Sequence, residues 1–219
     1  MMSGPDQVVA CPQCHGLAKY PTLISGNTLG MRAWTDGRRL APMLPEPPIY
    51  VQCGHCRECY WLADAPEVGL INGIGSVGHR GFINIAAIDV VREPGETRYY
   101  RALEAGLATS VKQAKVLRVL AWWRRNDTFR NMPEPAPNMR VLIQPRCEAN
   151  MEALAHVLNE RDVDEALMKA EVLRELGRFN AAQDVLGRAA LPEDVPVVAQ
   201  LTALCDSMDQ CVREVRCAG

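Results

Sequence analysis

Long apolar runs and common catalytic motifs are both absent from this sequence of 219 residues. No run of about 18 apolar residues occurs, so a membrane-spanning helix is not expected. The first residues contain neither a basic segment nor an apolar segment, which argues against a secretory signal peptide. We therefore expect a cytoplasmic protein whose thiols stay reduced.

Histidine is scarce, with four residues in the chain, and neither H-E-x-x-H, a phosphate-binding loop nor a paired nucleophile and base is found. His79 and His156 stand alone, as structural histidines usually do. Residues 73–78 spell G-x-G-x-x-G, but no βαβ unit surrounds them, so we interpret them as a glycine-rich loop. These absences predict a protein without enzymatic activity.

Cysteine is plentiful: nine are present, and four of them form two C-x-x-C pairs 38 residues apart, Cys11/Cys14 and Cys53/Cys56. In a reducing compartment such pairs are metal ligands more often than disulfides. Four thiolates give Zn²⁺ a closed tetrahedral site, whereas a catalytic zinc keeps one position open for water. We predict that Cys11, Cys14, Cys53 and Cys56 hold a structural Zn²⁺.

Other uses of these cysteines stay open. The first pair continues into His15, which matches the C-x-x-C-H haem pattern. The second pair is followed by Cys59 at iron–sulfur spacing, but the next cysteine of that pattern is missing. A redox pair would be expected to open a helix beside a βαβ unit, and neither pair does. Alternatively, His15, His55 or Cys59 could replace one of the four predicted ligands.

Short β-type segments flank both pairs, over residues 7–10, 50–52 and 60–62. Two C-x-x-C turns on such hairpins resemble a zinc ribbon, a rubredoxin-like pair of knuckles with the metal between their tips. The resemblance implies that residues 1–65 form a small β-rich domain with a long inserted loop. In the first knuckle we expect Gly16 to adopt the positive φ of the turn.

The inserted loop holds two recognisable features. Asp36-Gly37 is a strong β-hairpin pattern. Residues 41–48 contain four prolines, which predicts an extended surface segment. A glycine-rich connector over residues 66–96 follows, and its apolar run at 82–91 predicts a strand or a short buried segment.

The remaining residues, 97–219, show helical periodicity and predict an all-α domain. A first helix is expected over 97–107. Ser110 and Gln113 form a capping box for a second helix, which should end near Asn126.

Two further helical features are predicted. Residues 147–191 resemble helix–turn–helix repeats, and Leu176–Ala182 is similar to the second half of a tetratricopeptide repeat. A last helix over 194–215 carries apolar residues at alternating spacings of three and four, a seam that predicts internal packing or a homodimer. A zinc ribbon followed by helices resembles bacterial proteins of that architecture, and this implies no particular activity.

Charge is divided unevenly between two segments. Residues 97–130 contain eight Lys/Arg and two acidic residues, whereas residues 148–219 contain fourteen Asp/Glu and seven basic residues. The two segments are expected to pack against each other, or else the basic one meets an external anion. Trp122-Trp123-Arg124-Arg125 could stack on nucleic-acid bases, but we favour core positions for the indoles.

Together the patterns predict an α+β protein, a zinc ribbon followed by a helical-hairpin region. The function favoured by them is a non-enzymatic adaptor that binds a protein partner through its helices or through the loop at residues 25–48. The alternative is a nucleic-acid-binding protein that uses the zinc ribbon and the basic segment 97–130.

Overall fold

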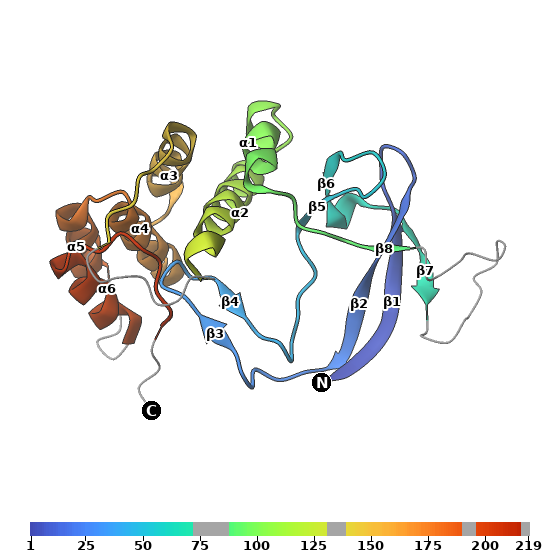
Figure 1. Cartoon of the computed structure of the whole chain (residues 1–219), viewed down its shortest axis with the longest axis horizontal. Coiled ribbons are helices and arrows are strands. Elements are labelled where there is room, and N and C mark those ends of the chain that lie inside the picture. Colours follow the sequence, from blue (N-terminus) through green and yellow to red (C-terminus); the bar gives the residue numbers. More distant parts are fainter. Residues whose placement is uncertain (72–87, 131–138, 190–195, 216–219) are drawn as a thin grey trace. The chain divides into compact units, whose positions relative to one another are not determined.

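The computed structural model describes residues 1–71, 88–130, 139–189 and 196–215 (Figure 1). Strands form the N-terminal part and six helices follow among the described residues, which confirms the predicted α+β class. The chain divides into an N-terminal unit, residues 1–31 and 41–98, and a helical unit, residues 32–40 and 99–219. In the described part of the chain, no helix combines the length and apolarity needed to cross a membrane.

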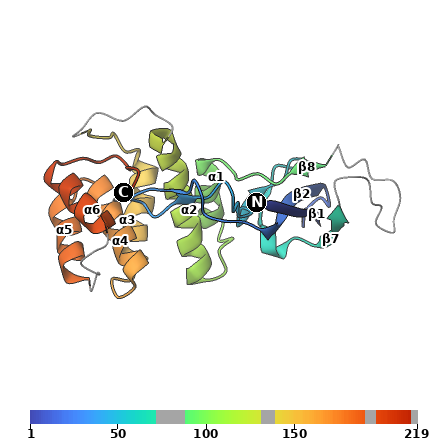
Figure 2. The same cartoon turned by 90° about the horizontal axis from the view of Figure 1, so that it is seen from below.

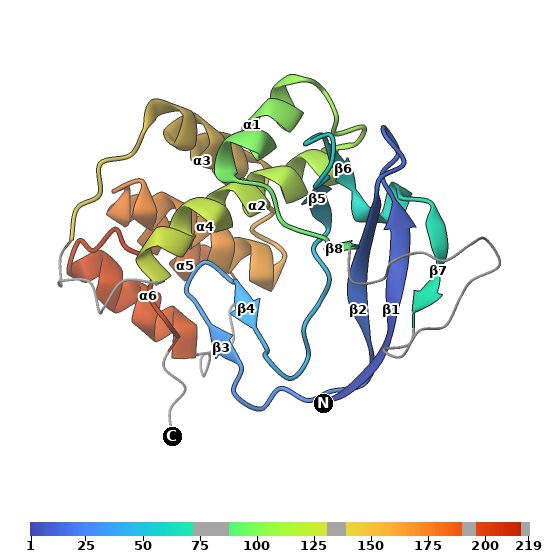
Figure 3. The same cartoon turned by 45° about the vertical axis from the view of Figure 1, so that its right-hand side comes forward.

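The N-terminal unit contains a four-stranded sheet of order β7-β1-β2-β8 (Figure 3). Its strands are β1 (Met2–Ala10), β2 (Leu17–Ser25), β7 (Glu67–Ile71) and β8 (Asp89–Val90). β1 pairs antiparallel with β2 and β7, and β8 pairs parallel with β2. Because strand side chains alternate between faces, Val8 packs with Ile71 and Ile88, whereas Val9 packs with the cysteine-bearing core.

A second, shorter hairpin completes the N-terminal unit. It pairs β5 (Tyr50–Gln52) with β6 (Cys59–Trp61) and continues into a 3₁₀ turn, η1 (Leu62–Asp64). The Tyr50 and Trp61 rings meet edge to face at 5.1 Å between centroids. Both C-x-x-C pairs therefore lie at the ends of antiparallel strands.

The segment predicted as a connector, residues 66–96, supplies β7 and β8 to the sheet. Of the strand expected at 82–91, only the part from residue 88 is described, and β8 lies there. The G-x-G-x-x-G stretch at residues 73–78 lies outside the described residues.

Helices α2 to α6 pack in chain order, each against the next (Figure 2). With α1, which precedes them, their bounds are α1 (Glu96–Glu104), α2 (Val111–Arg130), α3 (Pro145–Val157), α4 (Val163–Glu175), α5 (Phe179–Arg188) and α6 (Pro196–Asp206). Their core contains Trp122, Met151, Leu154 and Leu201, all fully buried. The predicted turn at Gly177 is present with φ 76°, and it lets α4 and α5 pack closely.

A small hairpin from the inserted loop belongs to the helical unit. Strands β3 (Arg32–Ala33) and β4 (Arg39–Leu40) pair antiparallel, and Gly37 turns between them with φ 80°. This confirms the hairpin predicted at Asp36-Gly37. Trp123 of α2 donates its indole N–H to the Asp36 carbonyl at 2.9 Å, so the hairpin is fixed to α2.

Charged side chains are buried where this hairpin meets α2 and α4. Glu171 and Arg174 are fully buried and form a bidentate ion pair, both bonds 2.7 Å long. Glu175 accepts from Trp122 Nε1 at 2.9 Å and from Asn126 Nδ2 at 2.8 Å. Such groups are tolerated in a core only when paired. The indoles of Trp122 and Trp123 therefore contribute to the core, as predicted.

The Arg and Asp side chains around Glu175 complete this network. Arg125 contacts Glu175 at 3.1 Å, and Arg130 pairs with Asp36. Burial, and then the nearby Glu171 carboxylate, raise the pKa of Glu175 to about 8. Burial likewise raises the pKa of Asp36. Each of these buried carboxylates thus has a guanidinium beside it, and no local sequence pattern marks the carboxylates or their partners.

Two predicted helix ends are wrong. α2 continues past Asn126 to Arg130, because Asn126 is buried and bonded to Asp36 and Glu175 and so stays helical. The last helix ends at Asp206 and does not reach 215, since Met208 adopts φ 53° and Asp209 turns inward to bond the Cys211 amide.

These corrections change the predicted seam. Its first positions, Val198 to Cys205, lie on α6, whereas Val212 and Val215 follow in irregular chain beside the bridge between Trp34 and Glu214. Leu201 and Cys205 are buried in the core of the helical unit. The seam therefore serves internal packing over its first half and is not a continuous helix.

The predicted helix start at Ser110 is confirmed, but the Gln113 side chain bonds a different residue from the one predicted. Ser110 Oγ accepts from the Gln113 amide at 3.1 Å. The Gln113 side chain accepts in turn from Thr109, through the amide at 2.7 Å and the hydroxyl at 2.8 Å, rather than from Ser110. The bond from the Gln113 side chain back to the helix start therefore reaches one residue before the N-cap.

Candidate metal centre

The first cysteine pair forms a tight knuckle at the end of β1. The His15 amide donates to the Cys11 carbonyl at 2.9 Å, and the Cys11 amide donates to the Gly16 carbonyl at the same distance. These two bonds close the turn that carries Cys11 and Cys14. Cys11 is fully buried in the core with Val9 and Ala18, whereas Cys14 is exposed.

The second pair repeats this geometry at the end of β5. The Arg57 amide donates to the Cys53 carbonyl at 3.2 Å, and the Cys53 amide donates to the Glu58 carbonyl at 2.9 Å. The His55 amide also points at Cys53 Sγ, at 3.4 Å. Two matching turns therefore present two sulfur atoms each, which indicates a shared ligand rather than two independent sites.

Four sulfur atoms meet between the knuckles. Those of Cys11, Cys14, Cys53 and Cys56 all lie within 4.8 Å of one another. Two sulfur–sulfur contacts cross between the knuckles, Cys11 to Cys56 at 3.8 Å and Cys14 to Cys53 at 3.6 Å. A tetrahedral ion with bonds of about 2.3 Å to sulfur requires sulfur–sulfur edges of about 3.8 Å. The donor set and its spacing fit a Zn²⁺ ion.

The free thiols differ in how readily they ionise. The Gly16 amide lowers the pKa of Cys14 to about 7. Burial raises the pKa of Cys11. At Cys56 the Glu58 amide favours the thiolate, but burial and the neighbouring Cys14 raise the pKa to about 12. Four adjacent thiolates repel one another, so a cation is needed to hold all of them deprotonated.

The alternative ligands are not part of this group. Neither His15 nor His55 nor Cys59 belongs to it among the described residues, and both histidines are exposed. Burial raises the pKa of the Cys59 thiol. Cys205 and Cys211 are buried in the helical unit and belong to no metal-binding group in the described part of the chain.

The knuckle glycine has a different role from the predicted one. His15, not Gly16, adopts the positive φ, 59°, and Arg57 does so in the second knuckle with φ 66°. Gly16 is needed for space instead, because a Cβ atom there would lie 2.4 Å from Cδ2 of His55. The His55 ring therefore packs directly on the opposite knuckle and helps to hold the two turns together.

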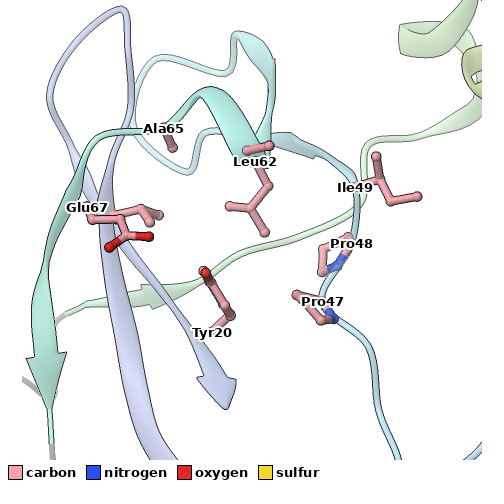
Figure 4. Close-up of a pocket in the computed structure, with 9 residues that line it drawn as sticks. Tyr20, Pro47, Pro48, Ile49, Leu62, Ala65 and Glu67 are labelled. Atoms are coloured by element: carbon pink, nitrogen blue, oxygen red, sulfur yellow. The ribbon is translucent and has the colours of Figure 1, made fainter. Parts of the chain in front are cut away.

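A cavity beside the metal centre was not indicated by any sequence pattern. It has a volume of about 300 Å³ and is lined by Val9, Tyr20, Pro47, Pro48, Ile49, Leu62, Ala63, Ala65 and Glu67 (Figure 4). Its lining comes from four separate segments of the N-terminal unit. No local motif could mark residues that only the fold brings together.

In comparisons with known proteins, no family model matches the chain, and no match was found among curated proteins or solved structures. The likeness to zinc ribbons and to tetratricopeptide repeats therefore depends on the local patterns described above.

Proposed function

We propose that this protein is a non-enzymatic adaptor whose four cysteines bind one structural Zn²⁺ in a zinc-ribbon-like unit. The observation that carries the proposal is the convergence of four cysteine sulfurs within 4.8 Å. Four thiolates saturate a tetrahedral ion, which leaves no position for a catalytic water. The ion's contribution is to join the two knuckles and fix the strands that lead into them.

An adaptor needs a surface for a protein partner, and the inserted loop supplies candidates. Large apolar side chains in this loop and next to its two ends stay exposed in the N-terminal unit, with exposed fractions from 39% to 76%: Ile24, Leu29, Met31, Leu44 and Ile49. Exposed large apolar side chains are typical of interaction sites where they gather on one surface. The repeat-like helices α4 and α5 provide a second, rigid element for the same role.

The nucleic-acid alternative gains less support. In the basic segment, Lys115, Arg124 and Arg125 form ion pairs inside the helical unit. The described residues of the N-terminal unit carry eight acidic and four basic side chains, a balance that disfavours phosphate. Nucleic-acid binding would require measurable affinity at about 50 mM salt and a steep loss of affinity as salt rises.

Metal content is the first test. Protein purified under reducing conditions should contain about one zinc per chain by elemental analysis. Cys53→Ser should lose the zinc together with folding of the N-terminal unit, whereas Cys59→Ser should keep both. Iron, haem absorbance, or a Cys53→Ser protein that retains full zinc would overturn the metal assignment.

Partner binding is the second test. The zinc-loaded protein is used to capture proteins from its native host, and each captured protein is purified and tested for direct binding. Leu29→Asp should weaken that binding because Leu29 is 76% exposed on the inserted loop. Leu142→Asp, which changes an even more exposed leucine of the helical unit, is the matched control. Substrate turnover by the zinc-loaded protein would contradict the adaptor role.

A further inference from the structure

The cavity of the N-terminal unit has an apolar lining with a carboxylate in it. Tyr20 of β2, Leu62 of η1 and the two prolines Pro47 and Pro48 surround one opening, and Glu67 at the start of β7 lies beside it (Figure 4). Apart from Glu67, the lining offers one polar side-chain group, the Tyr20 hydroxyl. A ligand for this cavity must therefore be mostly apolar and have a place for one charge.

The charge of that ligand follows from Glu67. Its side chain is exposed at the cavity, and its carboxylate forms no ion pair with the described residues. A cation in the cavity would meet an opposite charge at this carboxylate, and the Tyr20 ring adds a surface on which a cation can stack. An anion would instead meet like charge. Charge complementarity therefore selects a basic group.

The shape of the ligand follows from the apolar lining. Lysine and arginine combine a long alkyl stem with a terminal charge, so the stem can cover apolar surface while the charged end remains near water. We propose that the cavity binds a lysine or arginine side chain from an extended segment of the protein partner. The inference rests on the adaptor function proposed above and specifies the chemistry of the partner.

The cavity walls depend on the metal centre. Val9 precedes the ligand Cys11 by two residues, and Ile49 precedes Cys53 by four. The Leu62 amide donates to the Ile49 carbonyl at 3.0 Å, which joins two of the walls by a backbone bond. Loss of the ion should separate the knuckles and open the cavity, so binding of the basic side chain requires the metal.

A random dodecapeptide library displayed on phage, selected against the zinc-loaded protein, tests this inference. Selected peptides should be enriched in Lys or Arg next to Pro or aliphatic residues. A synthetic copy of a selected peptide should bind at least tenfold more weakly to Glu67→Gln. Its binding should be unchanged for Glu46→Gln, a control that alters another exposed acid of the same unit outside the cavity lining.

A second peptide, with norleucine in place of the basic residue, separates the charge from the stem, and the loss of affinity should be as large as that caused by Glu67→Gln. Equal binding to the Glu67→Gln and unaltered proteins, or selection of peptides without basic residues, would overturn the inference. Zinc content is measured on the same samples. Zinc-loaded protein that fails these tests contradicts this inference alone, whereas protein without zinc contradicts the proposed metal centre.

Discussion

The His55 side chain lies so close to Gly16 that it limits the geometry of the candidate metal centre. A Cβ atom at this position would lie 2.4 Å from His55 Cδ2 and 2.7 Å from its Cγ, so either the imidazole or the knuckle must move. We expect Gly16→Ala to lower the free energy of unfolding of the N-terminal unit by about 1–3 kcal/mol. The measurement is urea denaturation of the zinc-loaded protein.

Two further variants separate this contact from other effects of alanine. At Gly95 an added Cβ meets nothing within 4 Å, so Gly95→Ala should be nearly neutral. In a His55→Ala background the same Gly16→Ala change should lose most of its effect, because the clashing ring is gone. If the cost is unchanged there, the imidazole is not its cause.

Glu175 provides a pH-dependent contribution to stability. Burial raises the pKa of its carboxyl to about 8, from 4.5 in the absence of the fold. The folded protein therefore holds a proton that the unfolded chain releases, and the free energy of unfolding should fall as pH rises from about 4.5 to about 8. Glu175→Gln cannot titrate and should reduce that slope in urea denaturation followed by helical circular dichroism.

The control for this pH series is Glu152→Gln, an exposed carboxylate paired with Arg178 at the surface. For Glu152→Gln, the free energy of unfolding should change with pH as it does in the unaltered protein. Equal slopes for Glu175→Gln and the unaltered protein would show that Glu175 does not exchange a proton on folding.

At the residue scale, the sequence identified those positions whose chemistry is visible in a local pattern. The four-cysteine cluster was predictable because C-x-x-C places two sulfurs on one turn whatever the rest of the chain does. The positive φ of His15 was not, since glycine is the usual residue for that conformation and only the His55 contact reserves Gly16 for another role. Glu171 and Glu175 were missed because burial of a charge depends on distant partners.

At the scale of an element, the buried ion pair between Arg174 and Glu171 of α4 allows the clearest test of an interaction energy. Arg174 is fully buried and bonds Glu171 twice, and it also donates to the Cys211 carbonyl at 2.7 Å. Arg174→Met should destabilise the helical unit by about 3–5 kcal/mol, because it leaves the Glu171 carboxylate buried without its cation. Thermal or urea unfolding followed by circular dichroism measures the change.

Arg178 is the matched arginine, three residues after α4 ends. Its ion pair with Glu152 is half exposed on both sides, so Arg178→Met should cost no more than about 1 kcal/mol. A similar loss for the two variants would mean that burial does not decide the energetic weight of the Arg174 pair.

Helix starts were predicted better than helix ends. Ser110 marks the start of α2 through a local bond, so its pattern is readable from neighbouring residues. The end of α6 depends on Asp209, which bonds Cys211 and Arg213 where the chain turns back along the helical unit. The apolar spacing continued past that point, and periodicity alone cannot show that a tertiary contact has ended the helix.

For the whole molecule, the decisive prediction concerns how the two units respond to loss of the metal. The sulfur cluster lies in the N-terminal unit, where Cys11 and Cys53 are buried with Val9, Val51 and Tyr60. The helical unit has its own core, around Trp122 and Leu154. Removal of zinc by a chelator should therefore unfold the first unit and leave most of the second folded.

Hydrogen exchange measured by mass spectrometry resolves the two units in one sample. After chelation, amides of β1, β2 and β5 should lose protection, while those of α3, α4 and α5 should keep it. The β3–β4 hairpin is the informative segment: it lies between the cysteine pairs in sequence, yet Asp36 and Trp123 attach it to α2. We expect it to remain protected, because its stability comes from the buried network and not from the metal. Loss of protection in the hairpin along with β1 would show instead that the metal centre stabilises the inserted loop throughout its length.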